Sequence, residues 1–337
     1  MTSPIFLLAS ERSGTNLLRR RLSERQQTWF GPAPLHVLKH LYALEPLYGD
    51  LNQDAAFRAL ISDILGMAYK HFAPWDVTLD TDQVINGYPH YFDGPRSVIG
   101  VMHTLNSLYA AAKGYRSYLC KDNNLFDYIY PLSCALPEAR FIYLYRDPRD
   151  QITSQIRRPL KTSSVRRLAD AWVSEQLQCL RAITDPAIAR KTLCLSYEDL
   201  ITDESATIGA LCAWLGVETV PIGDSPFSAE STEIMEWKNL SGATMTGNFG
   251  GYKTALSANQ IRLVEQSSWA VMRKLGYPPD NPTRPRAGQV GIGMDYLNGL
   301  ASDGWRRLFR RRRMTAGQLA RQRHVRSMKA RLRCESP

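Results

Sequence analysis

The chain has 337 residues, of which 44% are hydrophobic and 22% are charged, as in an ordinary folded protein with one large α/β domain. Its net charge of +10 belongs to one end, because residues 301–337 hold twelve Arg and Lys against Asp303 and Glu335. The other 300 residues carry thirty charges of each sign. This balance disfavours nucleic acid as the partner of the main domain, and the basic segment needs a partner of its own.

The cysteines and the N-terminus indicate the compartment. Six cysteines form no close pair and most stand among apolar neighbours, which indicates reduced, packed thiols. The apolar stretch at residues 4–9 is too short to span a bilayer or to direct export. We therefore expect a cytoplasmic protein.

Short apolar runs alternate with longer helical patterns along residues 1–280, which is typical of a parallel sheet covered by helices on both faces. A helix is predicted from Ser257 to Leu275, because Ser257 and Gln260 form a capping box and the sequence LGYPP ends it. We predict a three-layer α/β domain here. Its strands are expected at residues 5–9, 117–121, 141–145 and 192–196, and its other helices begin near residues 14, 125, 148, 165 and 205.

The last part of the chain differs in composition. Residues 281–303 are rich in Pro, Gly and Asp, and we predict a linker there. In residues 304–337, apolar residues such as Met328 and Leu332 recur at helical spacing among arginines. This pattern indicates a basic amphipathic helix on an acidic membrane surface, and a solvated, disordered tail fits it equally well.

The first predicted strand ends in the loop SERSGTN, and a helix begins directly after it. Such a loop offers unpaired backbone N–H groups and the positive end of the helix dipole to an anion. A Walker A loop has a lysine where Thr15 stands here, so a triphosphate is disfavoured. An ordinary strand–helix turn with a surface arginine is the alternative. The residues expected to contact a phosphate are Arg12, Ser13, Gly14, Thr15 and Asn16.

The strand at residues 141–145 also ends in charge, with Arg146 as the first polar residue. A kinase or NTPase often has an acid there that holds magnesium, whereas an arginine suits a bidentate contact to phosphate. Pro148 fits the first turn of a helix, and Ser154 follows about two turns after Arg146. Arg146 and Ser154 can therefore hold one phosphate, and the two loops together predict a ligand with two phosphate groups.

The sequences ERSGT and RDPRDQITS, in this order, resemble the two cofactor loops of the sulfotransferase family, which uses 3′-phosphoadenosine 5′-phosphosulfate (PAPS). Residues 193–217 and 251–279 also resemble this family, so the likeness covers residues 4–280. It implies that the first loop binds the 5′-phosphosulfate and that Arg146 and Ser154 bind the 3′-phosphate. It also implies adenosine 3′,5′-bisphosphate (PAP) as product, with no metal.

The resemblance implies a base as well. Related enzymes place a glutamate or histidine after the first helix, and His36 is the candidate here. A histidine accepts a hydroxyl proton near neutral pH without a large change in its pKa, and a packed or surface histidine is the alternative. His36 and His40 have the spacing of zinc-protease ligands, but Val37 in place of the glutamate disfavours a metal site.

Three more positions bear on the site. Lys121 lies in a loop that resembles the acceptor side of the family, where Asn123 replaces a proline. Lys253 follows a glycine pair and is a candidate contact to the cofactor phosphate. An exposed lysine is the alternative in both cases. Glu11 replaces a proline frequent in this branch of the family, and we expect its carboxylate to turn away from the anion.

We therefore predict a PAPS-dependent sulfotransferase, with Arg12 as the electrostatic catalyst and His36 as the base. Two alternatives stay open: a nucleotide-dependent kinase, and a module that binds nucleic acid or membrane through the basic tail. We expect the acceptor to carry a hydroxyl, with an amine as the less favoured alternative, and the sequence leaves its class open among carbohydrates, phenols and lipids.

Overall fold

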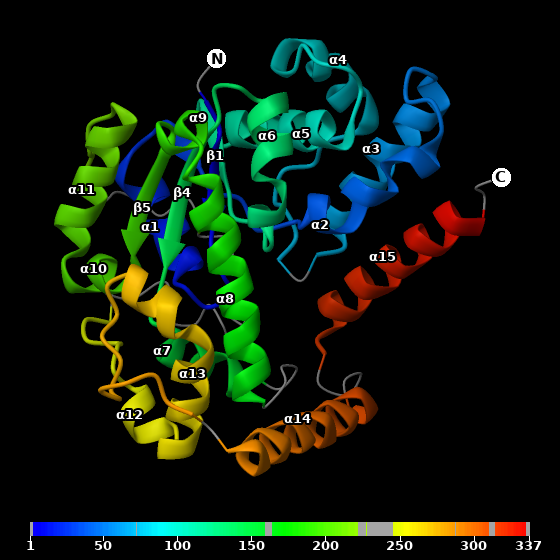
Figure 1. The fold of residues 1–337 in the computed structure, drawn as a ribbon. Helices are drawn as coiled ribbons and strands as arrows, with labels where there is room; N and C mark the ends of the chain where they lie inside the picture. The colour runs from blue at the N-terminus through cyan, green and yellow to red at the C-terminus, as the bar shows by residue number, and fades with distance from the viewer. Residues whose placement is uncertain are drawn as a thin grey trace.

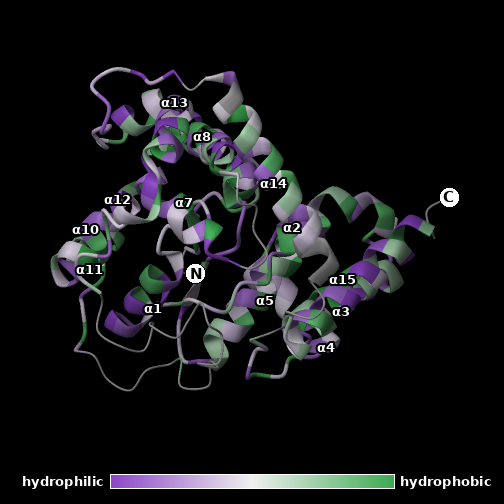
Figure 2. Ribbon diagram, turned by 90° about the horizontal axis from the view of Figure 1, so that it is seen from below, coloured by the Kyte–Doolittle hydropathy of each residue, from purple (hydrophilic) through white to green (hydrophobic). Residues whose placement is uncertain are grey.

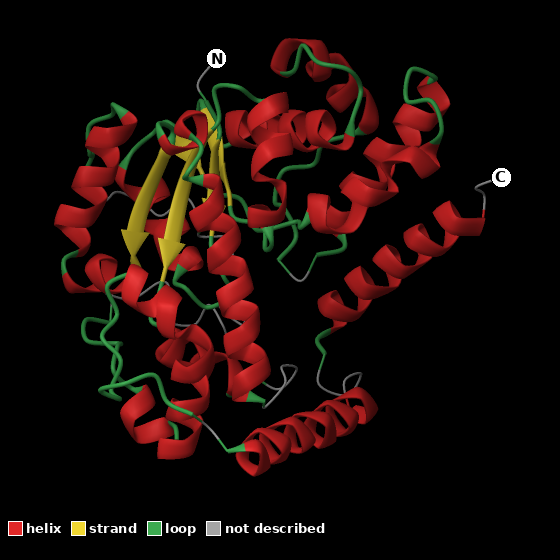
Figure 3. Cartoon of the chain, in the orientation of Figure 1, coloured by secondary structure: helices red, strands yellow, loops and turns green. Residues whose placement is uncertain are grey.

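The computed structural model describes residues 3–71, 73–158, 164–221, 227, 245–286, 288–309 and 314–334. Five parallel strands form a sheet in the order β2-β3-β1-β4-β5, with helices on both faces (Figure 1, Figure 3). The predicted three-layer α/β fold is confirmed. The strands are β1 (Ile5–Leu8), β2 (Trp29–Phe30), β3 (Ser117–Cys120), β4 (Arg140–Tyr145) and β5 (Thr192–Ser196).

Helices form most of the connections between the strands. Those that pack on the sheet include α1 (Thr15–Arg25), α5 (Val98–Ala112), α6 (Ile129–Ala135), α8 (Val165–Ala182) and α11 (Glu204–Leu215), whereas α3 (Asp54–Tyr69) packs on α5. Around them lie α2 (Val37–Leu41), η1 (Tyr42–Tyr48), α4 (Thr81–Tyr91), η2 (Leu125–Tyr128), α7 (Pro148–Ile156), α9 (Pro186–Ala189), α10 (Tyr197–Thr202), α12 (Tyr252–Ala255) and α13 (Ala258–Lys274). The described chain ends with α14 (Gln289–Phe309) and α15 (Ala316–Cys334).

The strand β1 shows why the sheet is covered on both faces. Phe6 and Leu8 belong to a hydrophobic core with α3, α5 and α8, whereas Ile5 and Leu7 belong to a second core with α1 and α11. All four side chains are at most 1% exposed. Because successive side chains point to opposite faces, a strand buried on both faces is apolar throughout.

The sequence prediction located four of the five strands and the starts of the helices near residues 14, 125, 148, 165 and 205. It did not identify β2, which has two residues, or the helices α3, α4 and α5. In α5, twelve of fifteen residues are buried, so no polar face marks the helical period. The predicted capping box of Ser257 and Gln260 is present at the start of α13.

The C-terminal helices differ from the sequence prediction. The helix α14 begins inside residues 281–303, where we predict a linker. The prolines end at Pro285, and the apolar residues after it have helical spacing. The helix α15 packs on α3 and η1, and Figure 2 shows hydrophilic and hydrophobic residues interspersed along it. Its Met328 and Leu332 are both 2% exposed, so its apolar face is buried in the core of this chain.

Candidate active site

The loop after β1 has an unusual backbone. Arg12 and Gly14 both lie in the left-handed region, with φ of 75° and 86°, and a Cβ on Gly14 would collide with the ring of Tyr197. A left-handed arginine costs about 1–2 kcal/mol and persists where its surroundings hold it. Gly14 is the N-cap of α1 and gives it no side-chain cap, so the first N–H groups of this helix are available to an anion.

The loops after β1 and β4 meet, because these strands are neighbours in the sheet. The Arg146 Nη1 donates a hydrogen bond to the Arg12 carbonyl oxygen at 3.1 Å. The Arg12 Nε donates to the Ser154 Oγ at 3.0 Å, and the Ser13 Oγ donates to the Gln151 Oε1 at 3.1 Å. The predicted residues Arg12, Arg146 and Ser154 therefore gather at the carboxyl edge of the sheet.

Arg146 is a buried cation, with 7% of its surface exposed. Its Nη2 donates to the Asn248 carbonyl oxygen at 3.0 Å, and its guanidinium carbon lies 4.1 Å from the centre of the Tyr197 ring. Its Nε has no hydrogen-bond partner among the described residues, and no described carboxylate forms an ion pair with it. A buried guanidinium with an unused donor fits a phosphate as its partner.

A short segment after residue 244 lies beside Arg146. Asp150 holds this segment, because its carboxylate accepts hydrogen bonds from the backbone N–H groups of Gly250 and Tyr252. Lys253 lies on α12 and is exposed. No described contact joins its side chain to Arg12, Arg146 or Ser154, so the structure does not bring this predicted residue into the cluster.

His36 lies on the other side of the first loop, at the N-terminal end of α2 with φ of 58°. Its Nδ1 accepts a hydrogen bond from the Asn123 backbone N–H at 2.9 Å and lies 3.7 Å from the Asp122 Oδ1. Burial, and then the positive charge of Arg321, lower the pKa of His36 well below its ordinary value. The ring is therefore neutral at physiological pH, and its proton is on Nε2.

The loop after β3 holds the neighbours of His36. The buried Asp122 carboxylate accepts a hydrogen bond from the Val37 N–H at 3.0 Å, and burial raises its pKa. The Lys121 Nζ donates to the Asn123 Oδ1 at 3.4 Å. Lys121 and His36, which we predict on the acceptor side, thus lie beside the same loop.

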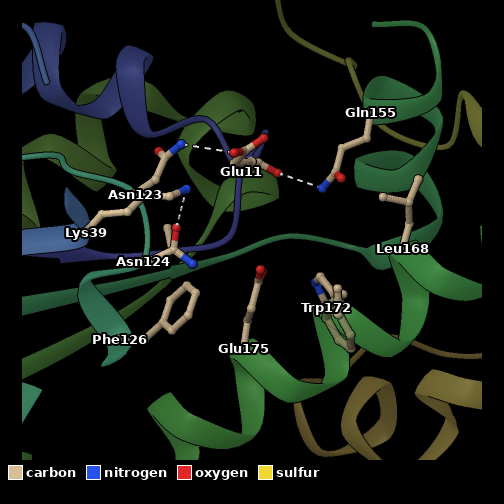
Figure 4. A pocket seen from close by; sticks show the side chains of 11 residues that line it. Glu11, Lys39, Asn123, Asn124, Phe126, Gln155, Leu168, Trp172 and Glu175 are labelled. Carbon is tan, nitrogen blue, oxygen red and sulfur yellow. Dashed lines mark hydrogen bonds between the residues drawn. The ribbon is translucent and has the colours of Figure 1, made fainter. Parts of the chain in front are cut away.

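A pocket with a cavity volume of ≈160 Å³ opens between these loops and α8 (Figure 4). Glu11 lines this pocket. Its carboxylate pairs with Arg158 at 3.2 Å and accepts from the Asn123 Nδ2 at 3.1 Å, so a cation offsets its charge beside the anion site. The other lining residues are Ala9, Lys39, Asn123, Asn124, Phe126, Gln155, Leu168, Ala171, Trp172 and Glu175.

Comparison with known proteins identifies the family. The model of the sulfotransferase family matches residues 4–221, which include both loops and His36. The chain belongs to the sulfotransferase family. The fold is similar to the sulfotransferase domain from the curacin biosynthetic pathway, with a TM-score of 0.50 and 17% identity over 82% of this chain and 99% of that one. It is also similar to the sulfotransferase domain of the Synechococcus PCC 7002 olefin synthase, with a TM-score of 0.50 and 20% identity over 80% of this chain and 95% of that one.

The predicted sulfotransferase enzyme is thereby confirmed, and nothing in these comparisons favours the kinase or the binding module. Within the described residues, no helix has both the length and the apolar character that crossing a membrane requires.

Several residues near the site were not identified from the sequence. Asp122 and Gln155 directly follow Lys121 and Ser154, so their place beside the two motifs is a signal that could have identified them. Arg321 has no such signal, because it is one arginine among many in the basic tail.

Proposed function

We propose that this sulfotransferase uses PAPS and transfers its sulfuryl group to a hydroxyl of a polar acceptor. This proposal rests on the cluster of Arg12, Arg146 and Ser154. In it, the buried guanidinium of Arg146 has an unused donor and no carboxylate partner among the described residues. When bound, PAPS would supply a sulfuryl group already activated on a phosphate. The residues of this chain then have to hold the phosphates and receive the proton of the acceptor.

Two groups of donors suit the two ends of this cofactor. Arg12 and the first N–H groups of α1 would stabilise the negative charge that develops on the leaving phosphate. Arg146 and Ser154 would hold the 3′-phosphate. Arg146 can donate to it from Nε, which has no acceptor among the described residues, and from Nη2, if the phosphate replaces the Asn248 carbonyl oxygen as its acceptor. Ser13, Thr15 and Asn16 complete the first loop. We assign Lys253 to the same phosphate, which requires its exposed side chain to turn inward.

His36 is the proposed base, and its hydrogen bonds determine which ring nitrogen carries the proton. With Nδ1 accepting from the Asn123 N–H, the neutral ring carries its proton on Nε2. To act as a base through Nε2, the ring must carry its proton on Nδ1 instead. The Asp122 Oδ1 lies 3.7 Å from Nδ1 and is the nearby acceptor for that proton. Asp122 would then hold the ring in the form that accepts a hydroxyl proton.

The pocket favours one class of acceptor among the three. Its cavity volume of ≈160 Å³ is below the roughly 300 Å³ at which sites for drug-sized ligands begin, so the described cavity suits a small group. Its polar lining includes Lys39, Asn123 and Glu175, and the rings of Phe126 and Trp172 provide apolar faces. We therefore infer that a hydroxyl-rich group such as a carbohydrate ring binds here, with Lys121 beside the lining residue Asn123.

The domain boundaries, the location of the protein in the cell and its contact with a membrane are predictions. We propose a catalytic domain at residues 1–280, followed by the C-terminal segment that carries α14 and α15, in a cytoplasmic protein. The buried Met328 and Leu332 remove the apolar face of α15 from any membrane contact. In α14, Leu297 and Trp305 are 64% and 62% exposed, so this helix is the better candidate for a membrane surface.

The proposal is tested by calorimetry with PAP and by screening labelled PAPS against acceptors of the three classes. Arg146→Ala should weaken PAP binding by about 2 kcal/mol, because a charged phosphate loses a charge-assisted partner. The matched control is Arg166→Ala, which removes an exposed ion pair on α8. Equal PAP affinity in both variants would remove Arg146 from the site, and absence of PAP binding by the wild type would contradict PAPS as the donor.

A further inference from the structure

The helix α15 is docked on the body of the enzyme by specific contacts. The Arg331 side chain pairs with Asp63 of α3 at 2.5 Å, and the His324 Nε2 lies 2.9 Å from the Asp63 carbonyl oxygen. The helices approach closely, because a Cβ on Gly66 would collide with the ring of His324. With Met328 and Leu332 buried, this helix has one defined position against α3.

This docking carries Arg321 into the acceptor side of the active site. The Arg321 Nη2 donates a hydrogen bond to the Leu35 carbonyl oxygen at 2.6 Å, and Arg321 is 9% exposed. Leu35 immediately precedes His36, whose backbone is left-handed. The charged hydrogen bond from Arg321 to the Leu35 carbonyl oxygen restrains the backbone of His36, which follows it in the left-handed region.

The electrostatic surroundings of His36 come from four elements. Lys39 lies on its own helix, Lys121 and Asp122 follow β3, His71 follows α3, and Arg321 comes from α15. The buried Asp122 attracts Arg321 and also binds the N–H of Val37. Asp122 and Arg321 thus hold the chain on both sides of His36.

We propose that Arg321 is a positioning residue for His36, so that the C-terminal helix completes the acceptor side of this sulfotransferase. The residue itself touches neither cofactor nor acceptor. It fixes the segment that presents His36 and keeps a positive charge beside the ring. This inference rests on the proposed function, because it needs His36 to act on the acceptor. It adds a part of the chain that lies outside the matched family model, which ends at residue 221.

The test compares Arg321→Gln, Arg321→Lys and the control Arg326→Gln, an exposed arginine on the same helix. Each protein is measured for PAP affinity by calorimetry and for its transfer rate against pH, with the acceptor found by the PAPS screen. Arg321→Gln should lower kcat by roughly tenfold to a hundredfold, as expected when a catalytic group is misplaced, with PAP affinity unchanged. Because the positive charge opposes protonation of His36, its loss should also move the acid limb of the profile to higher pH.

The lysine variant separates charge from geometry. Arg321→Lys keeps the charge but loses the planar fork, so the acid limb should stay in place while kcat falls a few-fold. If Arg321→Gln does not fold, Arg321→Lys decides, and wild-type kcat in that variant would overturn the proposal. Rates and profiles of all three variants equal to wild type would overturn it as well. In these cases the wild type still binds PAP and transfers sulfuryl, whereas failure of the proposed function abolishes both.

Discussion

The proposed cofactor side and the proposed acceptor side of this active site are assembled in different ways. Arg12 and Arg146 each follow a buried strand directly, and the sheet brings the two together because β1 and β4 are neighbours. On the acceptor side, His36, Asn123 and Arg321 come from two loops and the last described helix. Local motifs can thus specify a cofactor site, whereas the acceptor site depends on how distant segments pack.

The largest expected effect tests the rigidity of the cofactor side. Gly14→Ala places a methyl group against the Tyr197 ring in a left-handed backbone, which should cost about 3 kcal/mol of unfolding free energy from strain and overpacking. Gly216→Ala is the control, because its φ is 75° but its surroundings are open, and about 1 kcal/mol is expected. Urea unfolding measures both. Equal losses would mean that the loop adapts to the methyl group, and PAP binding would then survive in Gly14→Ala.

The next effect tests the chemistry of the acceptor side. His36→Ala should lower the transfer rate by roughly a hundredfold through loss of the base, with PAP affinity kept. His40→Ala, one helical turn further on, is the matched control and should transfer at a nearly normal rate. Steady-state rates at saturating PAPS measure the difference. A nearly normal rate in His36→Ala would place the base elsewhere, and a matching loss of PAP affinity would break the separation of the two sides.

Acid should destabilise the protein, because helices around the sheet bury neutral histidines. Burial lowers the pKa of His103 on α5 to about 4, so the unfolded chain takes up the proton before the folded one does. The stability is therefore complete above about pH 6.5 and is lost as the pH falls toward 4, by roughly 2 kcal/mol between pH 8 and pH 5. Urea unfolding at both pH values should show a smaller loss for His103→Gln than for wild type. Identical losses would mean that His103 does not contribute.

The smallest effect concerns the hydrogen bond on His36. Asn123→Pro removes the N–H that occupies Nδ1 and should raise the transfer rate a few-fold, because the base-competent tautomer is released. Asn123→Ala keeps this N–H and loses the side-chain contacts to Glu11 and Lys121, so its rate should stay close to wild type. Rate measurements near neutral pH compare them. If the two variants change together, the side chain of Asn123 matters and the tautomer does not.

Four of the five strands and the two loops were predictable from the sequence, because an apolar run that ends in ERSGT or RDPRD marks both the end of a strand and the start of a proposed anion-binding loop. The sequence could not place Glu11, whose carboxylate is neutralised by Arg158 at a separation of 147 residues. The helix α5 is buried almost all round and so lacks a polar face to mark it. Basic residues of the tail all look alike in sequence, and only packing distinguishes the buried Arg321 from the exposed Arg326.

The contact between Arg321 and Leu35 joins positions 286 residues apart, and this has a consequence for biosynthesis. A ribosome releases the nucleotide-binding loops long before it adds the last helix. A nascent or interrupted product that stops short of residue 321 would carry both anion-binding loops but leave the segment before His36 unfastened. If Arg321 positions His36 as proposed, the order of translation would slow sulfuryl transfer until the C-terminal helix has emerged and docked.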